Sequence, residues 1–423
     1  MTSSLKRRQL LAGAASLAAL GAVPTLLPGA LAAKPPKHHV IVIGGGMAGA
    51  TVAKYLRMWG DRVAVTLIDR NAIYTSCIMS SLVLTGQRNM SSLRFKYDTL
   101  RKQYGVTIVT DEVLAVDAAN RSVTLGNGST LTADRIVMAP GIEFDAVPGL
   151  NNPDAMPHAW KAGPQTTLLK HQLNAMAAGG VAVLAIPKVP YRCPPGPYER
   201  ACLLADWMRV NKPGSKLLVL DANPDFVTEK DNFSNAFFDL HGNVIEYRTN
   251  TEVLSADAAT MTLQTTTGAV HGDVINLIPR QRCGTIVANA GLANATEGRF
   301  AGVNVLNYES TVAPGVHVIG DSSATTQPKA GHIANQEAKV CADAIVRAFA
   351  GLEPDPAPVT SSACYSTITM REASWLEAVF QYDPVTRAMA SVVNASGASV
   401  GWKRDNFDEM EEWFGYLMTD TFA

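Results

Sequence analysis

The sequence predicts an α/β protein in which two Rossmann-like domains are followed by a small C-terminal α+β domain. An apolar strand at residues 38–43 runs into a glycine-rich turn and a helix. A second strand–turn–helix–strand unit spans residues 181–225. The proline-rich segment EPDPAPVT, residues 353–360, then separates residues 361–423 from the rest of the chain. Strands that alternate with helices in this way form parallel sheets covered by helices.

The composition is that of a globular protein with two or three domains. The chain has 423 residues, of which 47% are hydrophobic and 17% are charged, and a chain of that length divides into several cores. Its formal net charge of −1 provides no basic surface for a nucleic acid. Beyond the N-terminus, no apolar run approaches the roughly 20 residues that cross a bilayer. We therefore expect no integral membrane anchor.

The N-terminus resembles an export signal. It has a paired-arginine start at residues 6–8, an Ala/Leu-rich stretch, and a small-residue cleavage site at residues 30–33. The alternative is a membrane anchor, but Gly21 and Pro24 interrupt the short apolar stretch. The arginine pair is similar to that of twin-arginine signals. We expect residues 1–33 to be removed and the mature protein to be periplasmic.

The first unit carries a complete dinucleotide fingerprint. Gly44, Gly46 and Gly49 form G-x-G-x-x-G between a strand and a helix, and Asp69 ends the next strand. Gly44 permits the tight turn, Gly46 lets the backbone approach a pyrophosphate, and Gly49 lets helix and strand pack closely. Amides at the helix start attract the phosphate charge, and the Asp69 carboxylate can accept a ribose hydroxyl.

Three later segments favour FAD as the dinucleotide. Residues 111–125 predict strands of a small sheet, residues 134–141 predict a strand with a Pro-Gly turn, and residues 316–321 predict a strand that ends in Gly-Asp. A helix that reaches Arg347 follows the last of these. Together they resemble the flavoprotein superfamily with two dinucleotide-type domains that includes the disulfide reductases.

This resemblance implies a discontinuous FAD-binding domain made of residues 34–160 and 281–352. It also implies that the carboxylate of Asp321 binds the ribityl chain, and that the following helix points its N-terminus at the flavin, where negative charge develops on reduction. The other residues expected at the flavin are Arg70, Val113, Ala139, Gly141, Gly320 and Lys329.

The second Rossmann-like domain, residues 161–280, lacks a nucleotide fingerprint. Between its first strand and a helix predicted over residues 201–210, the sequence reads RCPPGPYER, from Arg192 to Arg200. Proline has no N–H to donate, and its ring blocks close backbone approach, so this loop cannot cradle a pyrophosphate. We expect an electron donor other than a nicotinamide. The alternative, an NAD(P)H-dependent disulfide reductase, would need an unfamiliar binding route.

Cys193 in this loop is a candidate redox residue. A stiff, proline-rich loop suits a thiol that must stay in one place, and Glu199 could take or return a proton. An isolated cysteine is ordinarily a small buried hydrophobic residue, but Cys193 has a candidate partner in Cys364. No C-x-x-C pair occurs in the sequence, which argues against a zinc ribbon or a thioredoxin-like site.

RCPPGPYER, the Cys-Tyr-Ser start of the C-terminal domain and the export signal together resemble the flavoprotein subunits of flavocytochrome c sulfide dehydrogenases. The sulfide:quinone oxidoreductases are relatives of that family. The resemblance implies a redox-active disulfide between Cys193 and Cys364 beside the flavin, with Glu199 as the acid/base. It also implies a covalent bond from the sulfur of Cys77 to the flavin 8α-methyl group, and a free buried thiol is the alternative there. The cysteines outside this scheme are Cys202 and Cys341, expected in helix packing, and Cys283, expected in a turn near the flavin.

On this resemblance, the expected function is the oxidation of sulfide to sulfur or polysulfide by a periplasmic flavoprotein that contains FAD. The acceptor would be a c-type cytochrome on a separate subunit, because this chain has no C-x-x-C-H motif and hence no covalently attached haem of its own. One alternative is a sulfide:quinone oxidoreductase at the membrane surface. Another is a flavin electron carrier or soft-metal protein, with cysteines near His158 or His332 holding Cu(I).

The chain ends in a predicted amphipathic helix that carries Met410, Trp413, Phe414 and Leu417 on one face. We expect this face to pack in a core or against another surface. Membrane contact is disfavoured because the polar face of the helix is acidic. The acidic residues that could steer a cytochrome are Asp408, Glu409, Glu411 and Glu412.

Overall fold

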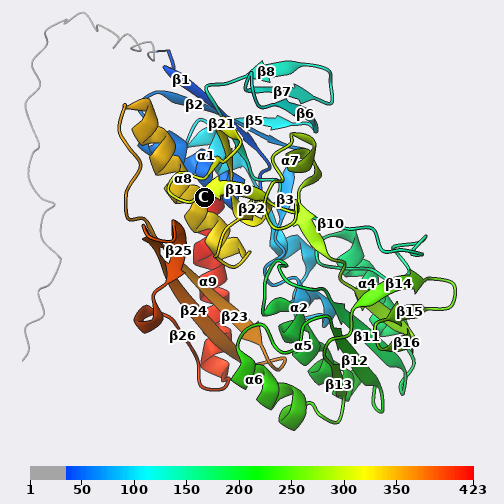
Figure 1. The fold of residues 1–423 in the computed structure, drawn as a ribbon. Helices are drawn as coiled ribbons and strands as arrows, with labels where there is room; N and C mark the ends of the chain where they lie inside the picture. The colour runs from blue at the N-terminus through cyan, green and yellow to red at the C-terminus, as the bar shows by residue number, and fades with distance from the viewer. Residues whose placement is uncertain (1–34) are drawn as a thin grey trace, which may run out of the picture. The chain divides into compact units, whose positions relative to one another are not determined.

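The first sheet places the glycine fingerprint at the carboxyl end of parallel strands. In the computed structural model, which describes residues 35–423, β1 (His38–Ile43) pairs in parallel with β2 (Val63–Asp69) and β9 (Arg135–Met138). The expected signal peptide, residues 1–33, lies outside the described residues. The full strand order is β22-β19-β20-β21-β9-β1-β2-β5 (Figure 1). The other strands are β5 (Thr107–Thr110), β19 (Ala301–Asn304), β20 (Glu309–Ser310), β21 (Ala313–Val318) and β22 (Ser323–Ala324).

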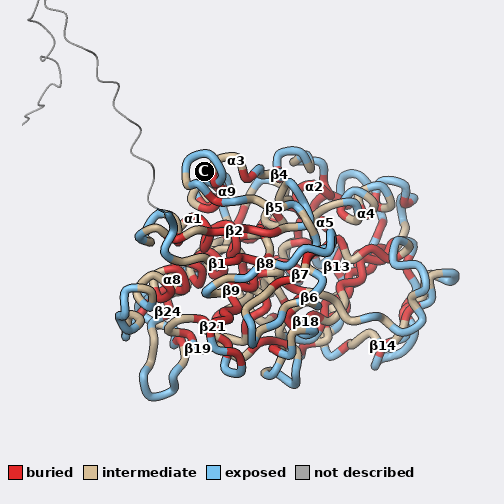
Figure 2. The backbone as a smooth tube through the Cα atoms, turned by 90° about the horizontal axis from the view of Figure 1, so that it is seen from above, coloured by how far each residue is buried: buried red, intermediate tan, exposed pale blue. Residues whose placement is uncertain are grey.

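Both faces of this sheet are covered, as a parallel sheet requires. Val40 and Val42 of β1 pack with α1 (Met47–Trp59) and α8 (Gly331–Phe349), whereas Ile41 and Ile43 lie in a separate core on the other face. The second core includes the small sheet expected from the sequence and α7 (Thr285–Asn289). Figure 2 shows the resulting band of buried strands. The small sheet consists of β6 (Val113–Asp117), β7 (Ser122–Leu125) and β8 (Thr130–Thr132).

The second Rossmann-like unit forms a four-stranded parallel sheet in the order β13-β12-β11-β17. Its helix α5 (Gly196–Asn211) begins five residues earlier than residues 201–210 predicted. The sequence-based boundary was wrong because it assumes that the prolines exclude a helix. Pro197 stands in the first helical turn, where the backbone N–H makes no bond within the helix and proline is tolerated. The strands are β11 (Val181–Ile186), β12 (Lys216–Asp221), β13 (Ile245–Arg248) and β17 (Val274–Leu277), with α4 (Pro164–Ala175) and α6 (Lys230–Ser234) alongside.

The chain passes between the two units through one antiparallel pair of short strands. β10 (Ile142–Phe144) leaves the first unit, and β18 (Gln281–Cys283) returns to it, with Ile142 opposite Cys283. Two further small sheets flank the units. They are β3 (Ile73–Thr75) with β4 (Arg94–Lys96), and β14 (Val253–Asp257) with β15 (Thr262–Thr265) and β16 (Gly268–His271). The remaining short helices are α2 (Ser81–Leu84) and α3 (Asp98–Lys102).

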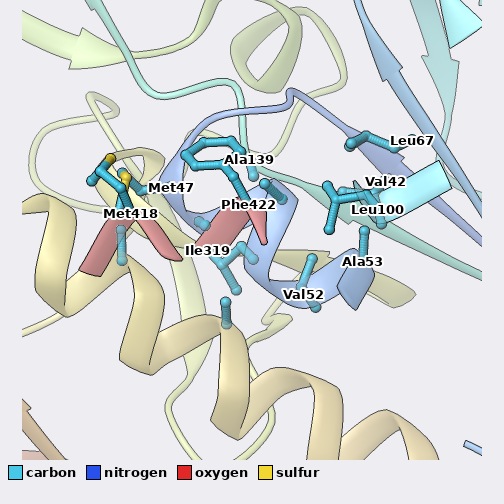
Figure 3. Packing of buried hydrophobic residues seen from close by; sticks show 14 of the residues in the cluster. Val42, Met47, Val52, Ala53, Leu67, Leu100, Ala139, Ile319, Met418 and Phe422 are labelled. Carbon is cyan, nitrogen blue, oxygen red and sulfur yellow. The ribbon is translucent and has the colours of Figure 1, made fainter. Parts of the chain in front are cut away.

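The C-terminal segment forms an antiparallel sheet and a long helix, α9 (Arg404–Phe422). The expected linker ends early, because Val359 and Thr360 already belong to the first strand. The apolar face of α9 packs into the core around α1 (Figure 3), so the prediction of a core-packing face is confirmed. Among residues 35–423, no helix is both long and apolar enough to cross a membrane. The strands are β23 (Val359–Thr367), β24 (Ala373–Asp383), β25 (Ala388–Ser391) and β26 (Gly397–Ala398).

Candidate functional site

The glycine fingerprint has the geometry that its sequence predicts. Gly44 has a φ of +96°, and a Cβ there would lie 2.4 Å from the carbonyl oxygen of Ala139. A Cβ on Gly49 would lie 1.7 Å from the carbonyl oxygen of Gly44. The carboxylate of Asp69 accepts a hydrogen bond from the N–H of Gly45 at 2.6 Å. The turn, the helix start and the acid are therefore held together as a dinucleotide site requires.

The predicted Gly-Asp turn at the end of β21 presents an unpaired carboxylate oxygen. Gly320 has a φ of +68°, which favours glycine, and its N–H donates to the Glu337 carboxylate at 2.6 Å. Oδ1 of Asp321 is buried without a hydrogen-bond partner. Burial raises the pKa of this carboxyl, and the charges of Arg192 and Lys329 oppose the rise. This oxygen has no hydrogen-bond donor, and a ribityl hydroxyl of FAD could supply one. The Gly320–Asp321 turn therefore fits the cofactor.

The other residues expected at the flavin differ in their placement. Lys329 donates from Nζ to the carbonyl of Ser323 at 2.6 Å and stands 3.9 Å over the ring of Phe300. Gly141 has a φ of +74°, and its carbonyl accepts the Ser322 hydroxyl at 2.5 Å. Arg70 is exposed to solvent. Of the remaining two, Val113 begins β6, and Ala139 follows β9 and donates from its N–H to the carbonyl of Ile43 at 2.8 Å.

Arg192 of the second unit contacts Cys77. The sequence predicted no role for this arginine. Sγ of Cys77 accepts hydrogen bonds from Nη1 of Arg192 at 3.3 Å and from the N–H of Ala162 at 3.4 Å. The same guanidinium donates to the carbonyl of Trp160 and interacts electrostatically with Asp321 and Cys193. One arginine of RCPPGPYER thus gathers the predicted flavin residues and the predicted redox cysteine around itself. The available signal was its position beside Cys193 in the motif.

Cys193 is held in a strained backbone conformation within the proline-rich loop that precedes α5. Its φ is +58°, which is uncommon for a residue with a side chain and clusters at functional sites. Its N–H donates to the carbonyl of Lys329 at 2.6 Å, and its carbonyl accepts the N–H of Gly196 at 2.9 Å. A Cβ at Gly196 would lie 2.8 Å from the Cys193 Sγ. The motif therefore needs its single glycine to make room for the thiol.

The fold brings Cys364 to the same place from the C-terminal sheet, because β23 packs against α5. Burial raises the pKa of the Cys193 thiol, and the charges of Cys364 and Glu199 raise it further. All six cysteines lie within the described residues, and each has a free thiol. The disulfide between Cys193 and Cys364 therefore stays a prediction.

Glu199 stands in the first turn of α5, next to both thiols. The hydroxyl of Thr367 donates to its carboxylate at 3.0 Å. Burial raises the pKa of Glu199 to about 7, against the opposing effects of the Thr367 hydrogen bond and the Arg200 charge. A group with such a pKa exchanges protons readily near neutral pH.

The raised pKa of Glu199 predicts a pH dependence of stability. The folded state holds the Glu199 proton more tightly than the unfolded chain, whose carboxyl has the ordinary value of 4.5. The resulting stabilisation is complete below about pH 4.5 and is lost as the pH rises through about 7, by up to roughly 3 kcal/mol. In Glu199→Gln, chemical denaturation at a series of pH values should lack this fall. The control is Glu143→Gln, because the pKa of Glu143 is lowered. An identical pH dependence in Glu199→Gln and the wild type would refute the assignment.

At the end of β12, the second unit lacks a residue that could bind the ribose of a nucleotide, just as its loop lacks the N–H groups that would bind the phosphates. Asp221 ends β12, as Asp69 ends β2 in the first unit. It is 0% exposed, and its carboxylate accepts the hydroxyls of Tyr198 at 2.7 Å and Tyr247 at 2.8 Å. The Asn223 side chain also donates to it at 2.7 Å. An acid so fully paired and buried has no capacity left for a ribose hydroxyl.

Neither histidine of the soft-metal alternative faces a ligand cluster. Nδ1 of His158 accepts the N–H of Trp160 at 2.9 Å, and Nδ1 of His332 accepts the N–H of Ala363 at 3.0 Å. Within residues 35–423, no group of three or more histidine, cysteine or acidic side chains could hold a metal ion.

Comparison with known proteins matches the separate parts of this architecture to one family. A family model for the central part of the sulfide dehydrogenase (flavocytochrome c) flavoprotein chain matches residues 166–279, and the flavin-binding model of flavocytochrome c sulfide dehydrogenase matches residues 356–422. The sulfide dehydrogenase (flavocytochrome c) flavoprotein chain of Chlorobaculum thiosulfatiphilum is 41% identical over 45 residues, which are 11% of this chain and 94% of that sequence. The chain belongs to the flavocytochrome c sulfide dehydrogenase flavoprotein family. It is therefore an FAD-binding oxidoreductase.

The first unit of this flavoprotein is of a more widely shared type. A pyridine nucleotide-disulphide oxidoreductase model matches residues 38–174. The ferredoxin–NAD(+) reductase subunit of the benzene 1,2-dioxygenase system of Pseudomonas putida is 31% identical over 106 residues. That match covers 25% of this chain and 26% of the reductase, so the likeness extends to about a quarter of the relative's length.

Solved structures confirm the fold expected for a flavocytochrome c sulfide dehydrogenase flavoprotein. The sulfide:quinone oxidoreductase of Aquifex aeolicus superimposes with a TM-score of 0.73 at 18% identity, over 91% of each chain. The NAD-dependent persulfide reductase of A. fulgidus gives a TM-score of 0.61 at 14% identity, over 91% of this chain and 77% of its own. The two Rossmann-like units and the C-terminal segment are thus a shared framework.

The flavoprotein's three remaining cysteines are structural. Cys202 on α5 and Cys341 on α8 are fully buried, which confirms their expected place in helix packing. The expectation that Cys283 lies in a turn was wrong, because it ends β18 opposite Ile142 and is 1% exposed in the core that includes Ile41 and Ile43. Burial raises the pKa of its thiol, as is typical of an unreactive cysteine.

Proposed function

We propose that this chain is the sulfide-oxidising subunit of a periplasmic flavocytochrome, in which Cys193 and Cys364 form a redox-active disulfide beside FAD. The observation that carries the proposal is the replacement of the second nucleotide site. Its phosphate loop holds Cys193, its ribose acid Asp221 is buried under two tyrosines, and Glu199 lies beside the cysteine. These features favour a donor that reacts with a thiol pair over a nicotinamide as the source of the flavin's electrons.

Thiol–disulfide chemistry supplies a balanced route. Hydrosulfide attacks one sulfur of the disulfide, so that the S–S bond breaks, a persulfide forms on that cysteine and the other cysteine leaves as a thiolate. A second hydrosulfide takes the outer sulfur as HS–S⁻. Glu199 accepts the proton released from sulfur. FAD, when bound, accepts the electron pair as the disulfide re-forms and passes it on as single electrons.

Two further parts of the proposal concern the cofactor bond and the partner. The sulfur of Cys77 bonds covalently to the flavin, which would keep FAD on an exported protein. The acceptor is a c-type cytochrome on another subunit, because the flavoprotein family is named for a flavocytochrome c and this chain has no C-x-x-C-H motif.

Rapid anaerobic mixing tests the proposal. We expect sulfide to bleach the flavin absorbance within the turnover time of the protein, and NADH at the same concentration to leave it unchanged. Dithionite serves as the control that the flavin is reducible. Oxidation of the reduced protein by a soluble c-type cytochrome, without response to a quinone analogue, distinguishes the flavocytochrome from a quinone reductase. Bleaching by NADH but not by sulfide would overturn the proposal.

A further inference from the structure

A second acidic side chain, Glu229, lies close enough to Cys364 and Glu199 to interact electrostatically with both. It belongs to the loop between β12 and α6, and no motif in the sequence marks it. The hydroxyls of Ser366 and Ser374 each donate to one of its carboxylate oxygens, both at 2.7 Å. Both serines are 0% exposed. The C-terminal sheet therefore holds this carboxyl in one fixed orientation.

The same strand presents Cys364 to Glu229. Cys364 and Ser366 are two residues apart on β23, and alternate residues of a strand share a face. Burial raises the pKa of the Cys364 thiol to about 12, and the negative charge of Glu229 is the next largest cause, ahead of that of Glu199. Each predicted redox cysteine thus has a carboxyl of its own, Glu199 beside Cys193 and Glu229 beside Cys364.

The two carboxyls also act on each other. The charge of Glu229 contributes to the raised pKa of Glu199, and burial raises the pKa of Glu229 itself. Two carboxylates that share a buried site do not both ionise freely. Their hydroxyl donors come from one strand, since Thr367 bonds Glu199 and Ser366 bonds Glu229. The titratable and charged groups that face the pair are Cys193, Cys364, Cys202 and Arg200.

The backbone at Glu229 is strained in the same way as at Cys193. Its φ is +46°, a left-handed value that a residue with a side chain adopts at a cost.

We propose that Glu199 and Glu229 form a proton-sharing pair that takes up the proton released at sulfur. This inference rests on the proposed sulfide chemistry. Conversion of two hydrosulfide ions to one HS–S⁻ ion releases one proton and two electrons. The electron pair goes to the cysteine pair and then to FAD, and the proton goes to the carboxyl pair, which carries one negative charge at rest and none after uptake.

Infrared titration of the intact holoprotein tests the pair without any sulfide. The signal is the carbonyl stretch of a protonated buried carboxyl, followed against pH. In Glu229→Gln, removal of the neighbouring charge should lower the titration midpoint of Glu199 by about one pH unit, and Glu199→Gln should lower that of Glu229 similarly. Glu229→Asp keeps the charge and should restore the midpoint of Glu199. The matched control is Asp221→Asn, which removes a buried carboxyl that is bonded to Tyr198 and Tyr247 and should leave both midpoints unchanged.

A kinetic readout connects the pair to turnover. The pH profile of sulfide-driven flavin reduction should shift to lower pH in Glu229→Gln by the same amount as the Glu199 midpoint, and the double variant should lose little more rate than either single variant. An unshifted Glu199 midpoint in Glu229→Gln, with sulfide oxidation intact in the wild type, would overturn the pair alone. A different outcome is that the variants shift the midpoints but the wild type does not oxidise sulfide. That outcome would overturn the proposed function and, with it, the role of the pair in sulfide chemistry.

Discussion

Cys193→Ser should lower the rate of sulfide-driven flavin reduction by about a thousandfold or more, because it removes one of the two sulfurs that exchange with the substrate. Serine is close to cysteine in size and fits the space that Gly196 leaves beside the side chain. The loop also keeps its backbone bonds to Lys329 and Gly196. Stopped-flow absorbance of the flavin after mixing with sulfide measures the effect directly.

Two controls make the Cys193 result specific. Cys202→Ala removes a buried cysteine of α5 and should oxidise sulfide, with electron transfer to the flavin, at close to the wild-type rate, whereas Cys364→Ser should match Cys193→Ser. Dithionite should bleach the flavin in every variant. Sulfide oxidation that survives in Cys193→Ser would contradict the disulfide route and leave the chain as a flavin carrier.

Cys77→Ser should convert tightly retained flavin into flavin that is released by acid. In the wild type, we expect the yellow colour to precipitate with the protein, because a thioether bond survives denaturation. In Cys77→Ser, essentially all the flavin should appear in the supernatant. The folded variant should still bind FAD without the bond, since Gly44, Gly49 and Asp321 are unchanged. The measurement is the flavin absorbance of the pellet and the supernatant after acid precipitation.

The matched control for Cys77 is Cys283→Ala, which alters a cysteine that is buried in the core with Ile41 and Ile43. It should keep the flavin in the pellet. Flavin in the wild-type supernatant would contradict a covalent bond to Cys77. The thiol chemistry at Cys193 is tested separately, by the sulfide experiment.

The proline motif shows how far local sequence reaches. RCPPGPYER excludes a pyrophosphate loop without any structure, because proline lacks an N–H. Its helix start was misplaced, since a proline in the first turn looks like a loop residue when it is read alone. Arg192 and Asp221 were missed for a different reason. Their partners, Cys77 and the two tyrosines, come from other parts of the chain.

Sequence alone determined the features whose chemistry is local. The glycine fingerprint, the Gly-Asp turn, the missing second fingerprint and the amphipathic final helix each depend on neighbouring residues along the chain. Tertiary structure decided which distant groups meet. It brings Cys364 to Cys193 across about 170 residues, and it places Glu229 against Ser366 and Ser374. No periodicity or motif encodes such meetings, because they arise only when β23 packs against α5 and removes these side chains from water.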